Sequence, residues 1–239
     1  MSHPKPTPTP PSHTQPSQTQ PSQPQRPSVA FLPLASGLLM AGYLLLRPYG
    51  DSDGGDSLAA AEAFASNLWL FSHLAGAAAL VALAAFWTLH TTGPLRWAGP
   101  VGAALVLPYY GAETFALHEI GHRALSGDPA TLELVAAVRD NPAAVTLFAL
   151  GLLTLAVAGI AAALSWRRAH RPGRAAAALL PLAVVAALFL PQFFLPPAGR
   201  MAYGVVFAAA AVYAAITMRG GAGSQGTVSG RRPAATTAI

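Results

Sequence analysis

Six long apolar runs dominate this chain and restrict what it can fold into. The first, residues 29–46, contains eighteen residues without a charged side chain. A helix that crosses about 30 Å of hydrocarbon at about 1.5 Å per residue needs about 20 mostly apolar residues. Inside a bilayer the backbone must satisfy its own hydrogen bonds, which favours helices. We therefore predict an all-α fold, a six-helix transmembrane bundle with spans at about residues 29–46, 67–90, 98–122, 143–166, 175–195 and 201–218.

Composition supports this prediction. The chain is 53% hydrophobic and 10% charged, with a mean hydropathy of +0.45, which leaves too few charges for the surface of a soluble domain. It contains no cysteine, so disulfides, thiolate metal sites and thiol nucleophiles are excluded. Any metal would have to be bound by histidine and carboxylate side chains.

The two ends of the chain differ from the apolar runs. Residues 1–28 consist largely of Pro, Ser, Thr and Gln, and have too little apolar surface to offset the entropy of ordering. We predict a disordered, Pro/Ser/Thr/Gln-rich cytoplasmic tail at 1–28, a membrane domain at 29–218 and a second disordered cytoplasmic tail at 219–239.

Charge distribution predicts the orientation, because cytoplasmic loops are enriched in Lys and Arg. With the N-terminus and the C-terminus both cytoplasmic, the inner segments hold ten of the fourteen basic residues. The outer loops then hold Arg47, Arg123, Arg139 and Arg200. Seven of the nine acids also fall outside, and we expect the protein to be a multi-pass protein of the plasma (cytoplasmic) membrane. The outer acids are Asp51, Asp53, Asp56, Glu62, Asp128, Glu133 and Asp140.

This sorting also explains the net charge of +5 without nucleic acid. The expected partner is the lipid bilayer, and a homo-oligomer is one option for the assembly. Nucleic acid is not an expected partner. The sequence does not identify a protein partner.

Ionisable side chains within the apolar runs are costly, and each therefore needs a partner or a function. They are His73 in the second run and Glu113, His118, Glu119 and His122 in the third. Residues 118–122 read H-E-x-x-H. On a helix these two histidines lie about 40° apart on one face, so both can reach one zinc ion, and the adjacent glutamate can take a proton from metal-bound water.

The sequence of residues 118–122 resembles the HExxH motif of zincin metallopeptidases. The resemblance implies that His118 and His122 bind zinc and that Glu119 is the catalytic general base. It also requires a third ligand, for which Asp128, His73 or Glu133 are the candidates. The implied cofactor is zinc and the implied activity is that of a membrane-embedded metalloprotease or hydrolase.

Two other interpretations remain open. The third span could end near Leu117, so that residues 118–123 are interfacial polar residues at a helix end. Glu113 lies about 140° from His118, on the side of Tyr109, and these two are the remaining intramembrane polar residues of interest. We expect Glu113 to form a structural hydrogen bond, or to serve a small transporter or scaffold as a proton relay or cation site.

The order of a first span, a proline, an acidic loop and the sequence Asn-Leu-Trp-Leu-Phe-Ser-His-Leu-Ala-Gly from residue 67 resembles uncharacterised small multispan bacterial integral membrane proteins. That likeness covers most of residues 29–218 and implies no reaction. We expect an integral membrane protein with a His/Glu cluster near the extracytoplasmic end of the third span that binds a divalent metal, rather than an enzyme. If it is an enzyme, zinc-dependent hydrolysis is the expected chemistry.

Overall fold

The computed structural model describes residues 29–170 and 172–223, which form helices joined by turns and contain no strand. The prediction of an all-α fold is confirmed. The predictions for residues 1–28 and 224–239 lie outside the described residues. The last helix continues through Gly223, five residues beyond the predicted end of the sixth span at 218.

Within the described residues, three helices are long and apolar enough to cross a membrane: α3 (Asn67–His90), α7 (Pro142–Ala169) and α9 (Pro197–Gly223). Side-chain caps fix where two of them begin. Ser66 accepts a hydrogen bond from the backbone N–H of Trp69 at 3.1 Å. Asn141 accepts from the N–H groups of Ala143 and Ala144, and Pro142 follows at the first helical position. The predicted bounds of 67–90 are those of α3.

The third apolar run is helical beyond its predicted end. After η1 (Gly93–Trp97), α4 (Ala98–Gly111) leads into η2 (Ala112–Ala116), a π-helical turn, and then into α5 (Leu117–Leu125). The helix therefore continues past Leu117, and the interpretation that the span ends there, with interfacial residues 118–123 at the helix end, stays a prediction. The π turn inserts one extra residue and changes which backbone groups are paired.

The fifth apolar run is not one helix. It comprises η4 (Ala175–Ala177), α8 (Leu180–Ala187) and η5 (Pro191–Phe194). Pro181 stands in the first turn of α8 and Pro191 in the first turn of η5, where a missing backbone N–H is tolerated. Each of the two prolines thus stands where a new helical segment begins.

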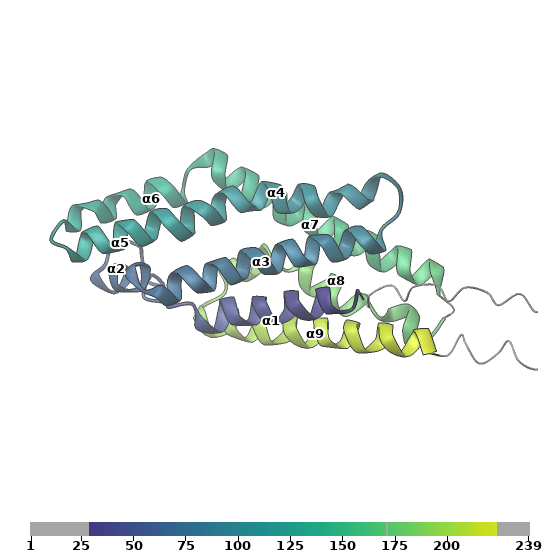
Figure 1. Cartoon of the computed structure of the whole chain (residues 1–239). Coiled ribbons are helices and arrows are strands. Elements are labelled where there is room, and N and C mark those ends of the chain that lie inside the picture. The colour runs from purple at the N-terminus through teal and green to yellow at the C-terminus, as the bar shows by residue number, and fades with distance from the viewer. Residues whose placement is uncertain (1–28, 171, 224–239) are drawn as a thin grey trace, which may run out of the picture.

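The long helices pack side by side into an elongated bundle (Figure 1). Helix α1 (Phe31–Leu46) lies between α3 and α9, and α4 packs along α7. Small residues permit the second contact, because a Cβ on Gly151 would meet the carbonyl oxygen of Gly102 at 2.8 Å. The fully buried large side chains include Phe86, Trp87, Leu155, Leu182 and Phe207.

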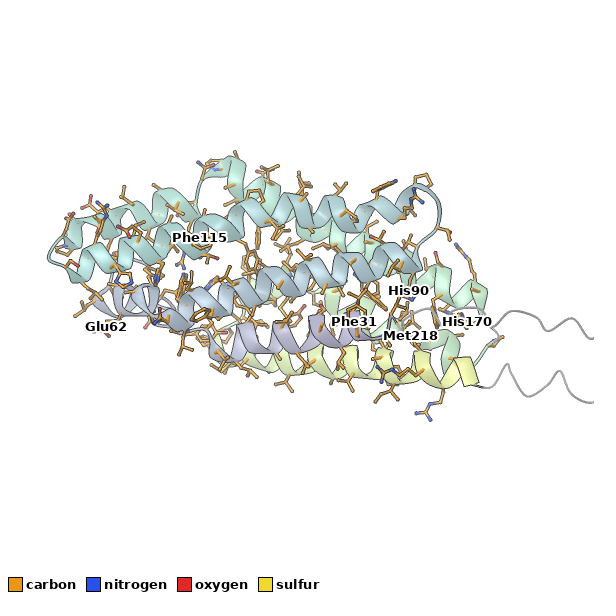
Figure 2. The ribbon with its side chains drawn as sticks, viewed as in Figure 1. Phe31, Glu62, His90, Phe115, His170 and Met218 are labelled. Carbon is orange, nitrogen blue, oxygen red and sulfur yellow. The ribbon has the colours of Figure 1, made fainter. Side chains whose placement is uncertain are left out.

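A second, smaller core closes one end of the bundle. We call residues 58–65 and 117–139 the cap. It contains α2 (Leu58–Ala65), α5, η3 (Pro129–Glu133) and α6 (Leu134–Arg139), which enclose Phe64, Trp69, Leu117, Leu132 and Val135. The cap lies at the left in Figure 1, opposite the end where α1 begins and α9 stops. Figure 2 places Glu62 at the cap, and His90 and His170 at the opposite end.

Candidate functional site

Four charged side chains meet where the cap joins the bundle, and we call them the charge cluster. Asp51 Oδ2 accepts hydrogen bonds from Arg47 at 2.7 Å and from Arg139 at 2.6 Å. Arg139 Nε also donates to Glu113 Oε1 at 3.0 Å. The side chains of Arg47 and Asp51 are only 6% and 5% exposed, and those of Arg139 and Glu113 19% and 14%. Arg139 therefore bridges two carboxylates that come from different parts of the fold.

Three members of the cluster lie at the end or at an irregularity of a helix, and the fourth lies in a loop. Arg47 directly follows α1, and Asp51 lies four residues further on in the loop. Arg139 is the last residue of α6, so the cap delivers it to the bundle. Glu113 belongs to the π turn η2, a type of helical defect that is frequent at functional sites.

Trp69 stabilises this π turn. Its indole Nε1 donates a hydrogen bond of 3.0 Å to the backbone carbonyl of Glu113. Trp69 is fully buried, so the bond satisfies an indole donor that would otherwise be costly. The contact fixes the backbone of Glu113 while its carboxylate is held by Arg139.

Aromatic rings surround the two arginines. The Arg47 guanidinium carbon lies 5.0 Å from the ring centroid of Tyr49 and 4.8 Å from that of Trp69. The guanidinium carbon of Arg139 lies 5.1 Å from the ring of Phe64. Cation–π contacts of this kind add to the ion pairs in a desolvated setting.

Electrostatics keep the cluster charged. Burial alone would raise the pKa of Asp51, but the guanidinium groups of Arg47 and Arg139 outweigh it and hold that pKa below its ordinary value. Burial would lower the pKa of Arg139, whereas the carboxylates of Glu113 and Asp51 raise it above its ordinary value. The carboxyl of Asp51 is therefore ionised at neutral pH.

Hydrogen bonding within the cluster is incomplete. Arg47 Nε and Asp51 Oδ1 are both buried, and neither has a hydrogen-bond partner in the described part of the chain. An unpaired buried polar atom costs free energy, so it marks strain or a functional requirement. Both side chains line a cavity.

This cavity has a volume of about 400 Å³, within the range of small-molecule sites. Its polar wall is the charge cluster together with side chains that include His73, Tyr43 and Tyr110. The remaining wall is apolar and comes from α7 and from the segment around η5. The apolar lining includes Val145, Phe148, Leu190, Phe193, Phe194 and Leu195.

The broken fifth run forms part of this wall. Irregular backbone at membrane depth is tolerated where it lines a cavity, and discontinuous helices commonly form the binding sites of transporters. After the break that follows α8, Phe193 and Phe194 of η5 line the same cavity as the charge cluster. The cavity thus combines a charged side with an apolar side.

The H-E-x-x-H residues lie on α5, which packs against α2 in the cap. His118 Nδ1 donates to the carbonyl oxygen of Phe64 at 2.7 Å, and its ring centroid lies 4.6 Å from that of His122. Glu119 instead pairs with Arg123 at 2.9 Å, with both side chains about two-thirds exposed. A backbone carbonyl can only accept, so Nδ1 of His118 is the donor in this hydrogen bond.

The described part of the chain places no third His, Asp or Glu ligand beside this pair. Residues 29–170 and 172–223 contain no group of three or more His, Asp or Glu side chains placed to hold a metal ion. Asp128 and Glu133 are exposed, whereas His73 is buried in α3 with its Nδ1 bonded to the carbonyl of Trp69 at 2.7 Å. The completion of the site by Asp128, His73 or Glu133 and the role of Glu119 as a base both stay predictions.

Residues of the H-E-x-x-H sequence also lie in the contact between two helices. Gly121 lies against α2, where an added Cβ would meet Phe64 Cβ at 2.7 Å and the backbone nitrogen of Ala65 at 2.7 Å. Ile120 is 7% exposed and belongs to the cap core. Ile120 and Gly121, which occupy the x positions of the H-E-x-x-H sequence, therefore pack α5 against α2.

Glu113 and Tyr109 lie on the same side of the helix, as the spacing indicated, and both contact Arg139. Tyr109 donates to the backbone carbonyl of Arg139 at 3.4 Å, whereas the carboxylate of Glu113 binds the guanidinium. Glu113 thus forms its side-chain bonds with a residue of another helix, α6. Sequence reasoning placed Arg47, Asp51 and Arg139 in outer loops but did not bring them together. The spacing of four between Arg47 and Asp51 was the one available signal.

Comparison with known proteins adds no relative: the sequence matches no family model, and searches of curated proteins and of solved structures gave no match.

Proposed function

We propose that this chain is an integral membrane protein that binds a small molecule in the cavity beside the charge cluster. In this proposal it has six spans, both termini are cytoplasmic, and the cap and cavity face outward from the plasma membrane. The charge distribution supports that orientation, because Arg167, Arg168 and Arg174 lie at the end away from the cap.

The observation that carries the proposal is the incompletely paired buried ion cluster next to a cavity. Burying a structural ion pair in an apolar bundle costs desolvation free energy. Well-packed apolar side chains of similar volume often stabilise a protein as much as the ion pair does. Here Arg47 Nε and Asp51 Oδ1 stay unpaired within the described residues, beside about 400 Å³ of space. This arrangement favours the interpretation in which Glu113 serves a transporter or scaffold. We specify that interpretation as a small-molecule binding site.

Two exposed residues of α7 offer a matched test. Val145 and Leu147 are both 41% exposed, but only Val145 lines the cavity. We expect Val145→Trp to obstruct the cavity and Leu147→Trp to leave it open. Both substitutions place the indole on an exposed surface, so both variants should fold.

The probe is decanol, a neutral amphiphile, and native mass spectrometry from a neutral detergent counts the bound molecules. We expect saturable binding to the wild type and to Leu147→Trp, with at least a tenfold loss in Val145→Trp. Equal binding in all three proteins would contradict the proposal.

A second candidate function is divalent-metal binding by His118 and His122. The hydrogen bond from His118 Nδ1 to Phe64 favours it, because metal-bound histidines commonly donate their other ring N–H to a carbonyl oxygen. With two protein ligands the site would be completed by water. The zinc hydrolase that the zincin resemblance implies would need a further ligand.

A further inference from the structure

Arg200 is the cavity-lining arginine outside the charge cluster. It lies in the first turn of α9, and its guanidinium donates hydrogen bonds to the backbone carbonyl oxygens of Phe193 and Leu195. Within residues 29–170 and 172–223 no carboxylate forms an ion pair with it. Neutral carbonyl groups satisfy some of its donors but leave its positive charge uncompensated.

The charges that line the cavity therefore do not balance. Three guanidinium groups and two carboxylates contribute to its wall, and both carboxylates are engaged by Arg47 and Arg139. One positive charge is left over, on Arg200. In a site of low dielectric an unbalanced charge favours a ligand of the opposite sign.

The apolar part of the cavity wall reaches the surface. Phe148 and Phe193 pack edge to face at 5.2 Å between ring centroids and line the interior. Val145, Phe194 and Leu195 also line the cavity and are 41%, 85% and 41% exposed. The mouth thus lies between the start of α7 and the segment that leads into α9, and it is flanked by exposed apolar side chains.

We propose that the cavity takes an amphiphile with one anionic headgroup, a carboxylate or phosphate ester on a hydrocarbon chain. Arg200 meets the headgroup, and Phe148, Phe193 and Val145 cover the chain. This assignment rests on the proposed function and specifies its ligand. A cation is disfavoured, because Asp51 and Glu113 are already bound by arginines.

The experiment measures binding to purified full-length protein by native mass spectrometry from a neutral detergent. The probes share a ten-carbon chain: decanoate, decyl phosphate, decanol and decyltrimethylammonium. We expect the two anions to bind the wild type about tenfold or more tightly than decanol, and the ammonium probe most weakly. Inorganic phosphate alone, added as a competitor, should not displace decanoate.

Three variants assign the preference to Arg200. Arg200→Gln should lose about tenfold or more in decanoate binding while it keeps decanol binding, which also shows that the cavity is intact. Arg200→Lys should keep the anion preference. Arg123→Gln removes an exposed guanidinium far from the cavity lining and should change neither.

The outcomes separate the two proposals. If decanol binds and Val145→Trp abolishes its binding, but anions bind no better than decanol, the proposed function stands and the anionic ligand is wrong. If no probe responds to Val145→Trp, both fail. Displacement of decanoate by inorganic phosphate would show that the site binds a free anion, and it would overturn the assignment of an amphiphile as the ligand. Arg200→Lys and Arg200→Gln could both lose the preference for anions while they still bind decanol. That result would reduce Arg200 to a positioning role and overturn its assignment to the headgroup.

Discussion

Arg139 at the end of α6 donates a 2.6 Å hydrogen bond to Asp51, 88 residues earlier in the chain. The same guanidinium holds Glu113 in the π turn. One side chain therefore ties the cap to the loop after α1 and to the irregular part of the third apolar run. The walls of the cavity depend on this connection.

Removal of Arg139 should destabilise the protein strongly. In Arg139→Gln the buried carboxylate of Asp51 keeps only Arg47, and Glu113 loses its ion pair. Breaking a buried ion pair costs about 3–5 kcal/mol, and we expect a loss near the lower end because Arg139 is 19% exposed. Thermal unfolding in detergent measures the loss.

Arg123→Gln is the matched control, because its ion pair with Glu119 is exposed and contributes about 0–1 kcal/mol. Similar unfolding temperatures for the two variants would contradict the structural role of Arg139.

Acid should weaken the cluster through Asp51. Burial raises its pKa, but Arg47 and Arg139 outweigh this and hold the pKa below 3.8. A carboxyl with a lowered folded pKa contributes stability that is present above its unfolded pKa, about 3.9, and is lost as pH falls through the folded value. The stability difference between wild type and Asp51→Asn should therefore be constant from about pH 7 to pH 5 and shrink below about pH 4.

Asp53→Asn, which changes an exposed carboxylate two residues away, serves as the control and should behave like the wild type across this range. A stability difference for Asp51→Asn that already disappears near pH 6 would argue against an ion-paired Asp51.

Two glycine substitutions should have different effects on stability, because Gly121 lies in the contact between α5 and α2 and Gly42 does not. Gly121→Ala places a Cβ 2.7 Å from backbone and side-chain atoms of α2, which should cost about 1–3 kcal/mol. Gly42→Ala in α1 meets nothing within 4 Å and should be neutral or stabilising by up to about 1 kcal/mol. Chemical or thermal unfolding distinguishes them, and equal effects would show that α5 and α2 do not pack closely.

Elemental analysis tests the histidine pair. If His118 and His122 bind zinc, the purified wild type should contain zinc, and His118→Ala/His122→Ala should contain at least tenfold less. Glu119→Gln should retain the metal, because Glu119 pairs with Arg123 instead of facing the two histidines as a ligand. Equal, near-zero zinc in wild type and double variant would remove metal binding as a candidate function.

The apolar runs were sufficient to predict where helices lie, because run length and a lack of charges are local properties. Residues 67–90 match α3, and 143–166 lies within α7. Helices α2 and α6 were not predicted, since they are short and lie within charged loops. Ser57, which caps α2 through the N–H of Ala60, was a readable signal for the first of them.

The candidate site was harder to predict because its members are distant in sequence. The spacing of Arg47 and Asp51 was visible, but their connection to Arg139 depends on the cap folding back onto the bundle. The positions of His118 and Glu119 suggested shared chemistry on one helix. In the fold, a carbonyl of α2 engages the first, and Arg123 engages the second at the surface.

Photocrosslinking tests whether an amphiphile occupies the cavity. A decanoate analogue with a diazirine on its chain is bound to the purified protein, irradiated and mapped by peptide mass spectrometry. Crosslinks concentrated at residues 145–149 and 190–197, and competed by unlabelled decanoate, are the expected result. Crosslinks spread over exposed apolar residues away from the cavity, such as Leu153, Val157 and Ile216, with no competition, would contradict the account.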